Sequence, residues 1–273
     1  MFGEVFYMSG KLRVIVTGVL GKMGLETVRA ISQDEGLELV GVVDVRGKYE
    51  PIASIISGIK EDITIANDLE AVIKDTKPDI MVDFTNPQAV FNNAKTALKN
   101  KIIPIIGTTG LNDVELNQLE RLALENDIGI AIIPNFAIGA VLMMKFAKEA
   151  AGYFPDVEII EMHHDQKMDA PSGTAIKTAE MISENRPIRT PKNIREYEKI
   201  AGSRGGDLNQ IRIHSVRLPG FVAHQEVIFG GLGQTLRIKH DSIDRIGFMP
   251  GVIMVIKKMA TQKGLIYGME NLM

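Results

Sequence analysis

Residues 161 to 175, EMHHDQKMDAPSGTA, gather side chains that can perform acid catalysis on an anionic substrate. His163 and His164 are two of the five histidines in the chain, and Lys167 follows closely. A histidine with its ordinary pKa of about 6.5 can donate a proton at neutral pH. The SGT sequence at 172 to 174 is typical of a helix start, whose free backbone amides attract anions. The segment therefore predicts a site that binds an acidic small molecule and protonates it.

Paired histidines also suggest a zinc site. Neighbouring residues on a strand point to opposite faces, so His163 and His164 at a strand end cannot easily bind one metal ion. The chain has neither an HExxH spacing nor a cysteine, and we expect no metal site. A second alternative, the commoner one for a lone histidine, is a structural ring in the core or an interface. The nearby lysine and helix start favour the catalytic interpretation.

The glycines of GVLGKMG, residues 18 to 24, follow an apolar run, LRVIVT, at 12 to 17. Their G-x-x-G-x-x-G spacing departs from the usual G-x-G-x-x-G, and alone it is weak evidence for a dinucleotide site, with a structural turn as the alternative. The order of strand, glycine turn and helix, the helix continuing to residue 31, lets backbone amides approach a pyrophosphate. Asp44 ends the next predicted strand, 20 residues beyond Gly24, where a carboxylate can accept hydrogen bonds from a ribose. Together these features predict a nicotinamide dinucleotide site.

The choice between NADH and NADPH depends on the residues after Asp44. Its carboxylate repels the 2′-phosphate of NADPH unless a cation lies beside it. Arg46 and Lys48 are near enough in sequence to serve, but they fit a solvated loop equally well. We favour NADH, with NADPH also usable.

Two further loops follow predicted strands, where ligands bind in a parallel sheet. GTTG at 107 to 110 is one, with a plain turn as its alternative, and PNFAIG at 134 to 139 is the other. Asn135 and Phe136 could lie along the cofactor, although spacing alone favours a core position for Phe136.

Short apolar runs alternate with helical segments in the first half of the chain. Helices are predicted to begin at Asn86, before Pro87, and at Asn112 or Asp113. This alternation predicts an α/β fold with a Rossmann-type, doubly wound parallel sheet. After the strand at 12 to 17, the predicted strands cover residues 37 to 43, 63 to 66, 79 to 84, 102 to 106 and 129 to 133.

The pattern changes after residue 135. A helix over 139 to 151, a strand over 157 to 163 and a helix over 172 to 184 precede a polar stretch at 185 to 210. Three β-rich runs follow, which look antiparallel. They predict a second α+β domain with an open mixed or antiparallel sheet. These runs cover 211 to 218, 222 to 229 and 234 to 240.

An apolar helix over about residues 248 to 262 is expected to pack against the first domain. We therefore predict a dinucleotide-binding domain over residues 1 to 135, rejoined by 241 to 273. The second domain would cover residues 136 to 240.

Composition limits the partners. Lysine plus arginine number 31 against 34 aspartate plus glutamate, so no nucleic-acid partner is expected. The absence of cysteine fits a reducing compartment, and we expect a cytoplasmic protein. The uncharged run at 128 to 144 is broken by Pro134 and Gly139 and fits a buried strand and helix better than a membrane span. The N-terminus lacks the pattern of a secretion signal, and Met8 is an alternative start.

Taken together, the motifs resemble the dihydrodipicolinate reductases, also called 4-hydroxy-tetrahydrodipicolinate reductases, of the diaminopimelate and lysine pathway. The likeness spans essentially the whole chain, and HHxxKxDAPSGTA is highly specific. The other motifs are GVLGKMG, DFTNP at 83 to 87, IGTTG at 106 to 110, PNFAIG, HSVRLPGFVAHQEVIFGG at 214 to 231 and HDSIDR at 240 to 245.

The resemblance implies hydride transfer from NADH or NADPH to C4 of a cyclic, dicarboxylated unsaturated imine. His163 would donate the proton, Lys167 would assist it and bind substrate, and His164 would contact a substrate carboxylate. Gly173 and Thr174 would hold the other carboxylate through their amides. The second domain would bind substrate and assemble a homotetramer through its open sheet. The positions that match cofactor contacts are Gly18, Gly21, Lys22, Met23, Asp44, Gly107, Thr108, Thr109, Asn135 and Phe136.

Some members of that family have glutamate followed by arginine where this chain has Asp44 and Val45, which displaces the neighbouring cation to Arg46. Two other functions fit parts of the sequence. Another two-domain nicotinamide dehydrogenase, acting on an amino or sugar acid, would share the cofactor half. A non-catalytic dinucleotide sensor would bind NADH without reaction. Neither needs the proton donor, lysine and anion-binding helix start together.

Overall fold

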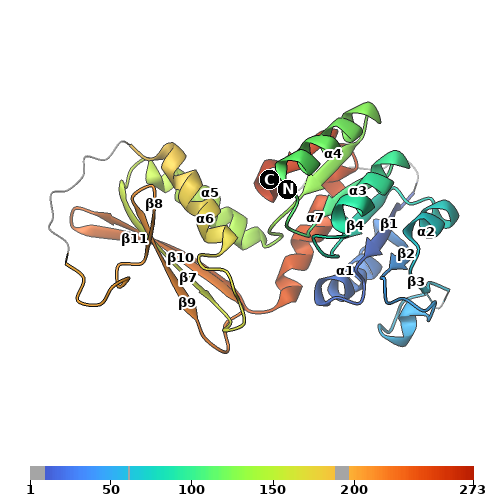
Figure 1. Cartoon of the computed structure of the whole chain (residues 1–273), viewed down its shortest axis with the longest axis horizontal. Helices are drawn as coiled ribbons and strands as arrows, with labels where there is room; N and C mark the ends of the chain where they lie inside the picture. The colour runs from blue at the N-terminus through green and yellow to red at the C-terminus, as the bar shows by residue number, and fades with distance from the viewer. Residues whose placement is uncertain (1–9, 61, 188–196) are drawn as a thin grey trace. The chain divides into compact units, whose positions relative to one another are not determined.

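The computed structural model describes residues 10–60, 62–187 and 197–273 (Figure 1). Backbone contacts divide the chain into two compact units. Unit 1 comprises Met1–Phe136 and Phe248–Met273, and unit 2 comprises Ala137–Gly247. The sequence patterns predict these divisions after residues 135 and 240. The second division lies later in the chain because the last strand of unit 2 runs on to Ser242.

Unit 1 contains a seven-stranded parallel sheet in the order β12-β6-β5-β4-β1-β2-β3. The order reverses between β1 and β4, which is the switch point where ligands bind in doubly wound sheets. The predicted Rossmann-type fold is confirmed. The strands are β1 (Leu12–Thr17), β2 (Leu37–Val43), β3 (Ile65–Ala66), β4 (Ile80–Asp83), β5 (Ile103–Ile106), β6 (Gly129–Ile132) and β12 (Gly264–Tyr267).

In the described part of unit 1, five α-helices accompany this sheet, and their apolar stripes bury the strands. They are α1 (Lys22–Gln33), α2 (Leu69–Thr76), α3 (Val90–Lys99), α4 (Asp113–Glu125) and α7 (Met249–Met259).

Two helix starts differ in how well the sequence predicts them. Asn112 caps α4 in a capping box with Glu115, as predicted. The prediction that a helix begins at Asn86 is wrong. The side chain of Asn86 accepts the amides of Gln88 and Ala89 at 3.0 and 3.1 Å, and α3 begins only at Val90. Asn86 therefore closes a turn before the helix, which is the other common use of asparagine.

The C-terminal segment completes unit 1. Helix α7 packs beside α1, and the Thr27 hydroxyl lies 3.8 Å from the Met249 sulfur. Gly251 passes so close to the chain at Phe136 that an added Cβ would lie 1.9 Å from its carbonyl oxygen. The predicted packing of this helix on the first domain is confirmed. Strand β12, which adds to the edge strand β6, is absent from the sequence prediction.

Unit 2 has a five-stranded mixed sheet in the order β11-β10-β7-β9-β8. Helices α5 (Ile138–Ala151) and α6 (Gly173–Asn185) pack against it. Along β7, alternate residues such as Ile159 and Glu161 are buried while their neighbours are half-buried, so one face carries the core. The strands are β7 (Asp156–His163), β8 (Gly206–Leu208), β9 (Ile211–Arg217), β10 (Ala223–Gly231) and β11 (Gln234–Ser242).

The pairing in unit 2 is only partly antiparallel. Strand β10 pairs antiparallel with β7 and β11, but β9 pairs parallel with β7. The expectation that all three late β-rich runs are antiparallel is therefore wrong for β9. The chain between β7 and β9 contains α6, and a crossover of that length permits parallel pairing. Short β8 was not predicted, and residues 188–196 of the predicted polar stretch lie outside the described residues, as does Met8.

Candidate functional site

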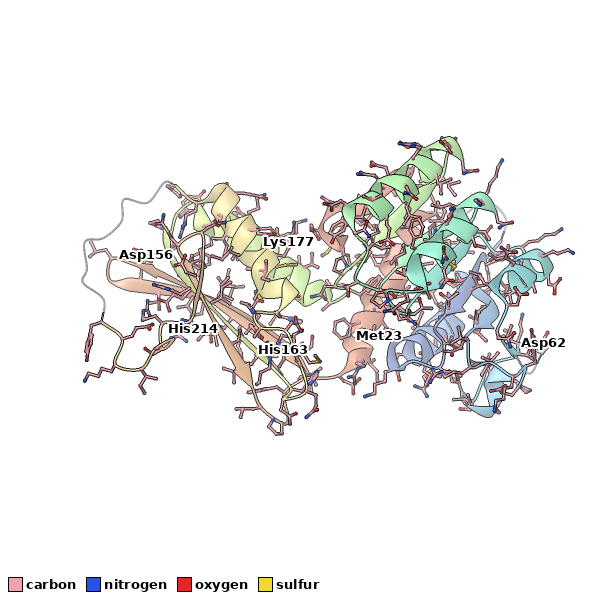
Figure 2. All side chains as sticks on the ribbon, viewed as in Figure 1. Met23, Asp62, Asp156, His163, Lys177 and His214 are labelled. Atoms are coloured by element: carbon pink, nitrogen blue, oxygen red, sulfur yellow. The ribbon has the colours of Figure 1, made fainter. Side chains whose placement is uncertain are left out.

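A hollow in unit 1 opens at the carboxyl ends of β1, β4 and β5. It brings together six of the ten residues predicted to contact the cofactor, among them Met23 (Figure 2). It also adds the loop after β4, which the sequence prediction left without a role. The lining residues are Gly21, Lys22, Met23, Phe84, Thr85, Asn86, Pro87, Gly107, Thr108 and Thr109.

The three glycines of the first loop serve two purposes. Gly18 has φ +76°, and an added Cβ would lie 2.4 Å from the carbonyl oxygen of Phe84. A Cβ on Gly24 would lie 2.3 Å from the Gly18 carbonyl oxygen. These two glycines permit close packing of backbone on backbone. Gly21 is the N-cap of α1 and faces the hollow, and among the described residues no side chain caps this helix. Its first amides therefore fit an anionic group such as a pyrophosphate.

Asp44 lies directly after β2 beneath the glycine loop and is only 6% exposed. One oxygen accepts the amide of Leu20 at 3.0 Å, and the other accepts the amide of Arg46 at 3.0 Å. The Arg46 guanidinium adds bonds of 2.9 and 3.2 Å. Burial raises the pKa of Asp44, but the hydrogen bonds from Arg46 and Leu20 outweigh burial and hold it below its usual value. The cation nearest this carboxylate is thus Arg46, whose side chain is 64% exposed.

Asp83 at the end of β4 is fully buried and holds the loops around the hollow. Its carboxylate accepts the hydroxyls of Thr17 at 2.8 Å, Thr85 at 2.6 Å and Thr108 at 3.1 Å, and the amide group of Asn93 at 2.8 Å. These partners come from β1, α3 and the loops after β4 and β5. Sequence reasoning gave Asp83 no role, although an aspartate that ends an apolar strand was a usable signal.

Asn135 and Phe136 are not among the residues that line this hollow. Phe136 is 3% exposed, and its ring centroid lies 5.6 Å from that of Phe84. Phe136 therefore supports a lining residue from within the core.

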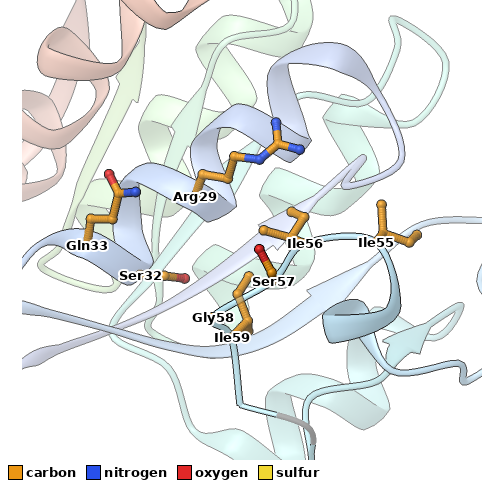
Figure 3. A pocket seen from close by; sticks show the side chains of 8 residues that line it. All are labelled: Arg29, Ser32, Gln33, Ile55, Ile56, Ser57, Gly58 and Ile59. Atoms are coloured by element: carbon orange, nitrogen blue, oxygen red, sulfur yellow. The ribbon is translucent and has the colours of Figure 1, made fainter.

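A second hollow in unit 1 lies between the C-terminal half of α1 and residues 55 to 59 (Figure 3). Arg29, Ser32 and Gln33 line it from the helix. It contains none of the residues predicted for cofactor or substrate, so we place neither ligand there.

In unit 2, His163, labelled in Figure 2, lies at the end of β7 and belongs to a polar cluster around the buried Glu161. Its Nδ1 lies 2.5 Å from Glu161 Oε2, two residues earlier on the same face. Arg217 is the register partner of His163 on β9. Its guanidinium donates to both oxygens of Glu161, each at 2.8 Å. The two strand ends thus bring a histidine, a carboxylate and an arginine together.

Glu161 has 0% of its surface exposed. Burial raises its pKa, but hydrogen bonds from His163, Arg217 and Ser215 prevail and lower the pKa to about 2. The carboxylate is therefore charged at neutral pH. Sequence reasoning missed both Glu161 and Arg217. The spacing of two residues between Glu161 and His163 was a usable signal. Arg217 lies 56 residues from Glu161, and no local sequence pattern links the two.

Lys167 lies in the loop after β7, where its Nζ is 2.6 and 2.8 Å from the two carboxylate oxygens of Asp169. Its backbone amide donates to the carbonyl of His164 at 3.2 Å, which closes the turn. Arg217 reaches this loop too, because its Nη2 donates to the Asp169 carbonyl at 2.7 Å. The hydrogen bond from Lys167 lowers the pKa of Asp169.

Helix α6 begins at Gly173, and Ser172 is its N-cap, as predicted for this segment. The Ser172 hydroxyl accepts the amide of Ala175 at 3.2 Å. The backbone amide of Ser172 donates to Glu161 Oε1 at 3.2 Å. Space around Gly173 is open, since an added Cβ would meet nothing within 4 Å. The helix start therefore adjoins the cluster around His163 and leaves room for a ligand beside it.

Two family models cover nearly all of the chain. Residues 12–136 match the model of the dihydrodipicolinate reductase N-terminus, and residues 139–273 match that of the C-terminus. No helix among the described residues is both long and apolar enough to cross a membrane.

Curated relatives agree with this match. A 4-hydroxy-tetrahydrodipicolinate reductase from Syntrophomonas wolfei is 67% identical over 97% of this chain and all of its own length. One from Desulfitobacterium hafniense is 53% identical over 96% of this chain and 98% of its own.

Solved structures divide into two kinds. A dipicolinate-bound dihydrodipicolinate reductase from Paenisporosarcina sp. TG-14 superposes with a TM-score of 0.86 at 47% identity, covering 97% of this chain and 100% of its own. An amine dehydrogenase from Mycobacterium smegmatis reaches a TM-score of 0.66 at 11% identity, covering 94% and 95%. At that identity the second likeness concerns the fold alone.

Proposed function

Because the chain belongs to the dihydrodipicolinate reductase family, we propose that it reduces 4-hydroxy-tetrahydrodipicolinate to tetrahydrodipicolinate, with loss of the 4-hydroxyl group as water, in diaminopimelate and lysine biosynthesis. The observation that carries this proposal is the cluster of His163, Lys167 and the α6 start in unit 2. A proton donor, an ammonium group and a helix start suit a cyclic dicarboxylate. The dipicolinate-bound relative supports a small dicarboxylate as the ligand.

Each residue of this cluster has a proposed role. His163 donates a proton to the enamine-like product of hydride addition, and Lys167 binds the substrate and assists. His164 contacts one carboxylate, while the amides of Gly173 and Thr174 hold the other. Because Lys167 forms a salt bridge with Asp169, a substrate carboxylate must compete with Asp169 for the ammonium group.

We propose that the hollow of unit 1 holds the nicotinamide cofactor, which would supply the hydride for substrate C4. The α1 start beside Gly21, which no described side chain caps, would hold the pyrophosphate. Gly18 shapes this loop, and the residues after β5, Gly107 to Thr109, line the other side of the hollow. Lys22, Met23, Asn135 and Phe136 are proposed contacts or supports.

NADH is the proposed preferred cofactor, with NADPH also usable. The buried, charged Asp44 disfavours a 2′-phosphate, whereas the exposed guanidinium of Arg46 beside it offsets part of that repulsion.

We also propose that unit 2 assembles a cytoplasmic homotetramer through the sheet face opposite its buried core. Half-buried residues such as Ile160 and Met162 on β7 point to that face. The resemblance to the family supports this assembly, and sedimentation of the purified protein tests it.

The central experiment follows oxidation of NADH and NADPH by the purified protein. We expect turnover only when freshly generated 4-hydroxy-tetrahydrodipicolinate is present, with no turnover on amino acids or sugar acids. Absence of turnover with both cofactors would overturn the proposed function.

A further inference from the structure

We propose that the Glu161–Arg217 ion pair is the positioning element of the substrate site, fixing the proton donor, the lysine loop and the carboxylate-binding helix start relative to one another. This inference rests on the proposed function and adds two residues to it. Neither is a catalytic residue, because each acts through the groups it holds.

The first step concerns the histidine ring. Glu161 is acceptor-only when ionised, so the His163 Nδ1 that faces its Oε2 at 2.5 Å carries a hydrogen. The proton transferred to the substrate must therefore leave from Nε2. The N–H bond at Nε2 breaks, its electron pair stays on that nitrogen, and the neutral ring keeps its hydrogen on Nδ1. Glu161 thus decides which ring nitrogen performs the chemistry.

The second step concerns the helix start. Glu161 Oε1 accepts the amide of Ser172 at 3.2 Å, while its other oxygen bonds to His163. Ser172 directly precedes Gly173 and Thr174, whose amides are the proposed carboxylate contacts. One rigid carboxylate therefore sets the spacing between the proton donor and the group that holds the substrate.

The third step explains the arginine. A fully buried carboxylate is costly without a partner, and Arg217 supplies one with two parallel bonds of 2.8 Å. The same guanidinium donates to the carbonyl of Asp169 at 2.7 Å, and the Asp169 carboxylate holds Lys167. Arg217 thus extends the frame from the histidine to the lysine.

Unit 2 contains a closely similar arrangement that serves as a control. Glu158, on the same strand, bonds to Arg204 at 2.6 Å and to His214 Nε2 at 2.9 Å. It is directed away from the buried face that carries Glu161. If the Glu161 pair were purely structural, breaking it should change kcat no more than breaking the Glu158 pair.

The first experiment compares Glu161→Gln with Glu158→Gln. Glutamine keeps the shape and an acceptor oxygen but removes the charge. We expect kcat to fall about 10- to 100-fold in Glu161→Gln, with substrate KM raised several-fold and cofactor KM within about two-fold of wild type. Glu158→Gln should keep wild-type kcat and substrate KM. Equal effects of the two substitutions on kcat would overturn the proposal.

The second experiment separates positioning from stability with the apolar pair Glu161→Leu/Arg217→Met. Replacing both partners of a buried ion pair commonly preserves the fold. We expect this double variant to unfold at a temperature close to that of wild type while kcat stays at least about 10-fold low. A double variant with wild-type kcat would overturn the proposal. If it does not fold, the Glu161→Gln comparison decides the question.

The third experiment does not need turnover. Nitrogen-15 NMR of labelled histidine, assigned with His163→Gln, identifies which ring nitrogen carries the hydrogen in the neutral form. We expect Nδ1–H in wild type and a shift towards Nε2–H in the apolar double variant. Nε2–H at His163 in wild type would overturn the proposal. An inactive wild type that still shows Nδ1–H would instead overturn the proposed function alone.

Discussion

Gly18 packs its α-carbon against the backbone carbonyl of Phe84, which leaves no room for a side chain. This contact joins the loop after β1 to the loop after β4, and both loops border the hollow of unit 1. Gly18 also has φ +76°, a conformation that disfavours other residues.

Gly18→Ala should therefore reduce both stability and cofactor binding. We expect a loss of roughly 2 kcal/mol or more in the free energy of unfolding, since strain and a clash act together. Gly58 provides the matched control, because it has φ +84° but nothing within 4 Å of an added Cβ. Gly58→Ala should cost only about 1 kcal/mol and leave cofactor binding unchanged. Urea unfolding and cofactor titration measure both, and equal losses would contradict the packing explanation.

Asp83→Asn tests whether the buried carboxylate organises the cofactor loops. Asparagine brings two N–H donors to a place where the surrounding threonine and asparagine groups donate. We expect roughly 1 to 3 kcal/mol lower stability and about a 10-fold higher KM for the cofactor. The exposed Asp62→Asn in the same unit should change neither quantity. An unchanged cofactor KM in Asp83→Asn would show that these loops keep their places without it.

Arg46→Ala tests cofactor choice. Removing the exposed guanidinium beside Asp44 should raise the KM for NADPH about 10-fold and leave that for NADH within about two-fold, because only NADPH carries the 2′-phosphate. Lys48→Ala is the control in the same loop. Titration of both cofactors against each variant gives the answer, and parallel changes for NADH and NADPH would assign Arg46 a structural role only.

His163→Gln tests the proton donor. Loss of a general acid should lower kcat by about two to four powers of ten while nearly sparing cofactor affinity. Steady-state kinetics with both substrates measure this split. If kcat were unchanged, His164 or a water molecule would have to supply the proton.

The low pKa of Glu161 predicts a specific loss of stability in acid. Its pKa is about 2 in the folded chain and about 4.5 when unfolded, so the folded state prefers the charged form. The stabilisation is complete well above pH 4.5 and is lost as the pH falls towards 2. By pH 3 the wild type should have lost roughly 2 kcal/mol from this group alone. Glu161→Gln should lack this component when unfolding is compared at pH 6 and pH 3 by urea titration; equal losses in both proteins would contradict it.

The sequence predicted the fold where periodicity and caps are strong. The apolar run at 12 to 17, the glycine turn and the cap at Asn112 all depend on neighbouring residues. The helix start predicted at Asn86 was wrong because an asparagine side chain can either cap a helix or close a turn. Four-residue β12 and three-residue β8 are too short to show a period.

The same distinction applies to the candidate site, where adjacent residues were predictable and residues distant in sequence were not. The residues of EMHHDQKMDAPSGTA are recognisable because they are adjacent. Arg217 became a neighbour of Glu161 only through the parallel pairing of β7 with β9, a long-range choice that no local pattern encodes.

The return of the chain to unit 1 has a consequence for biosynthesis. Strand β12 covers the edge of β6, but the ribosome makes it only after all of unit 2. A nascent chain therefore carries an unfinished sheet with a bare edge while more than a hundred further residues are translated. Loss of chaperones or premature termination of translation should consequently impair the folding of unit 1 more than that of unit 2.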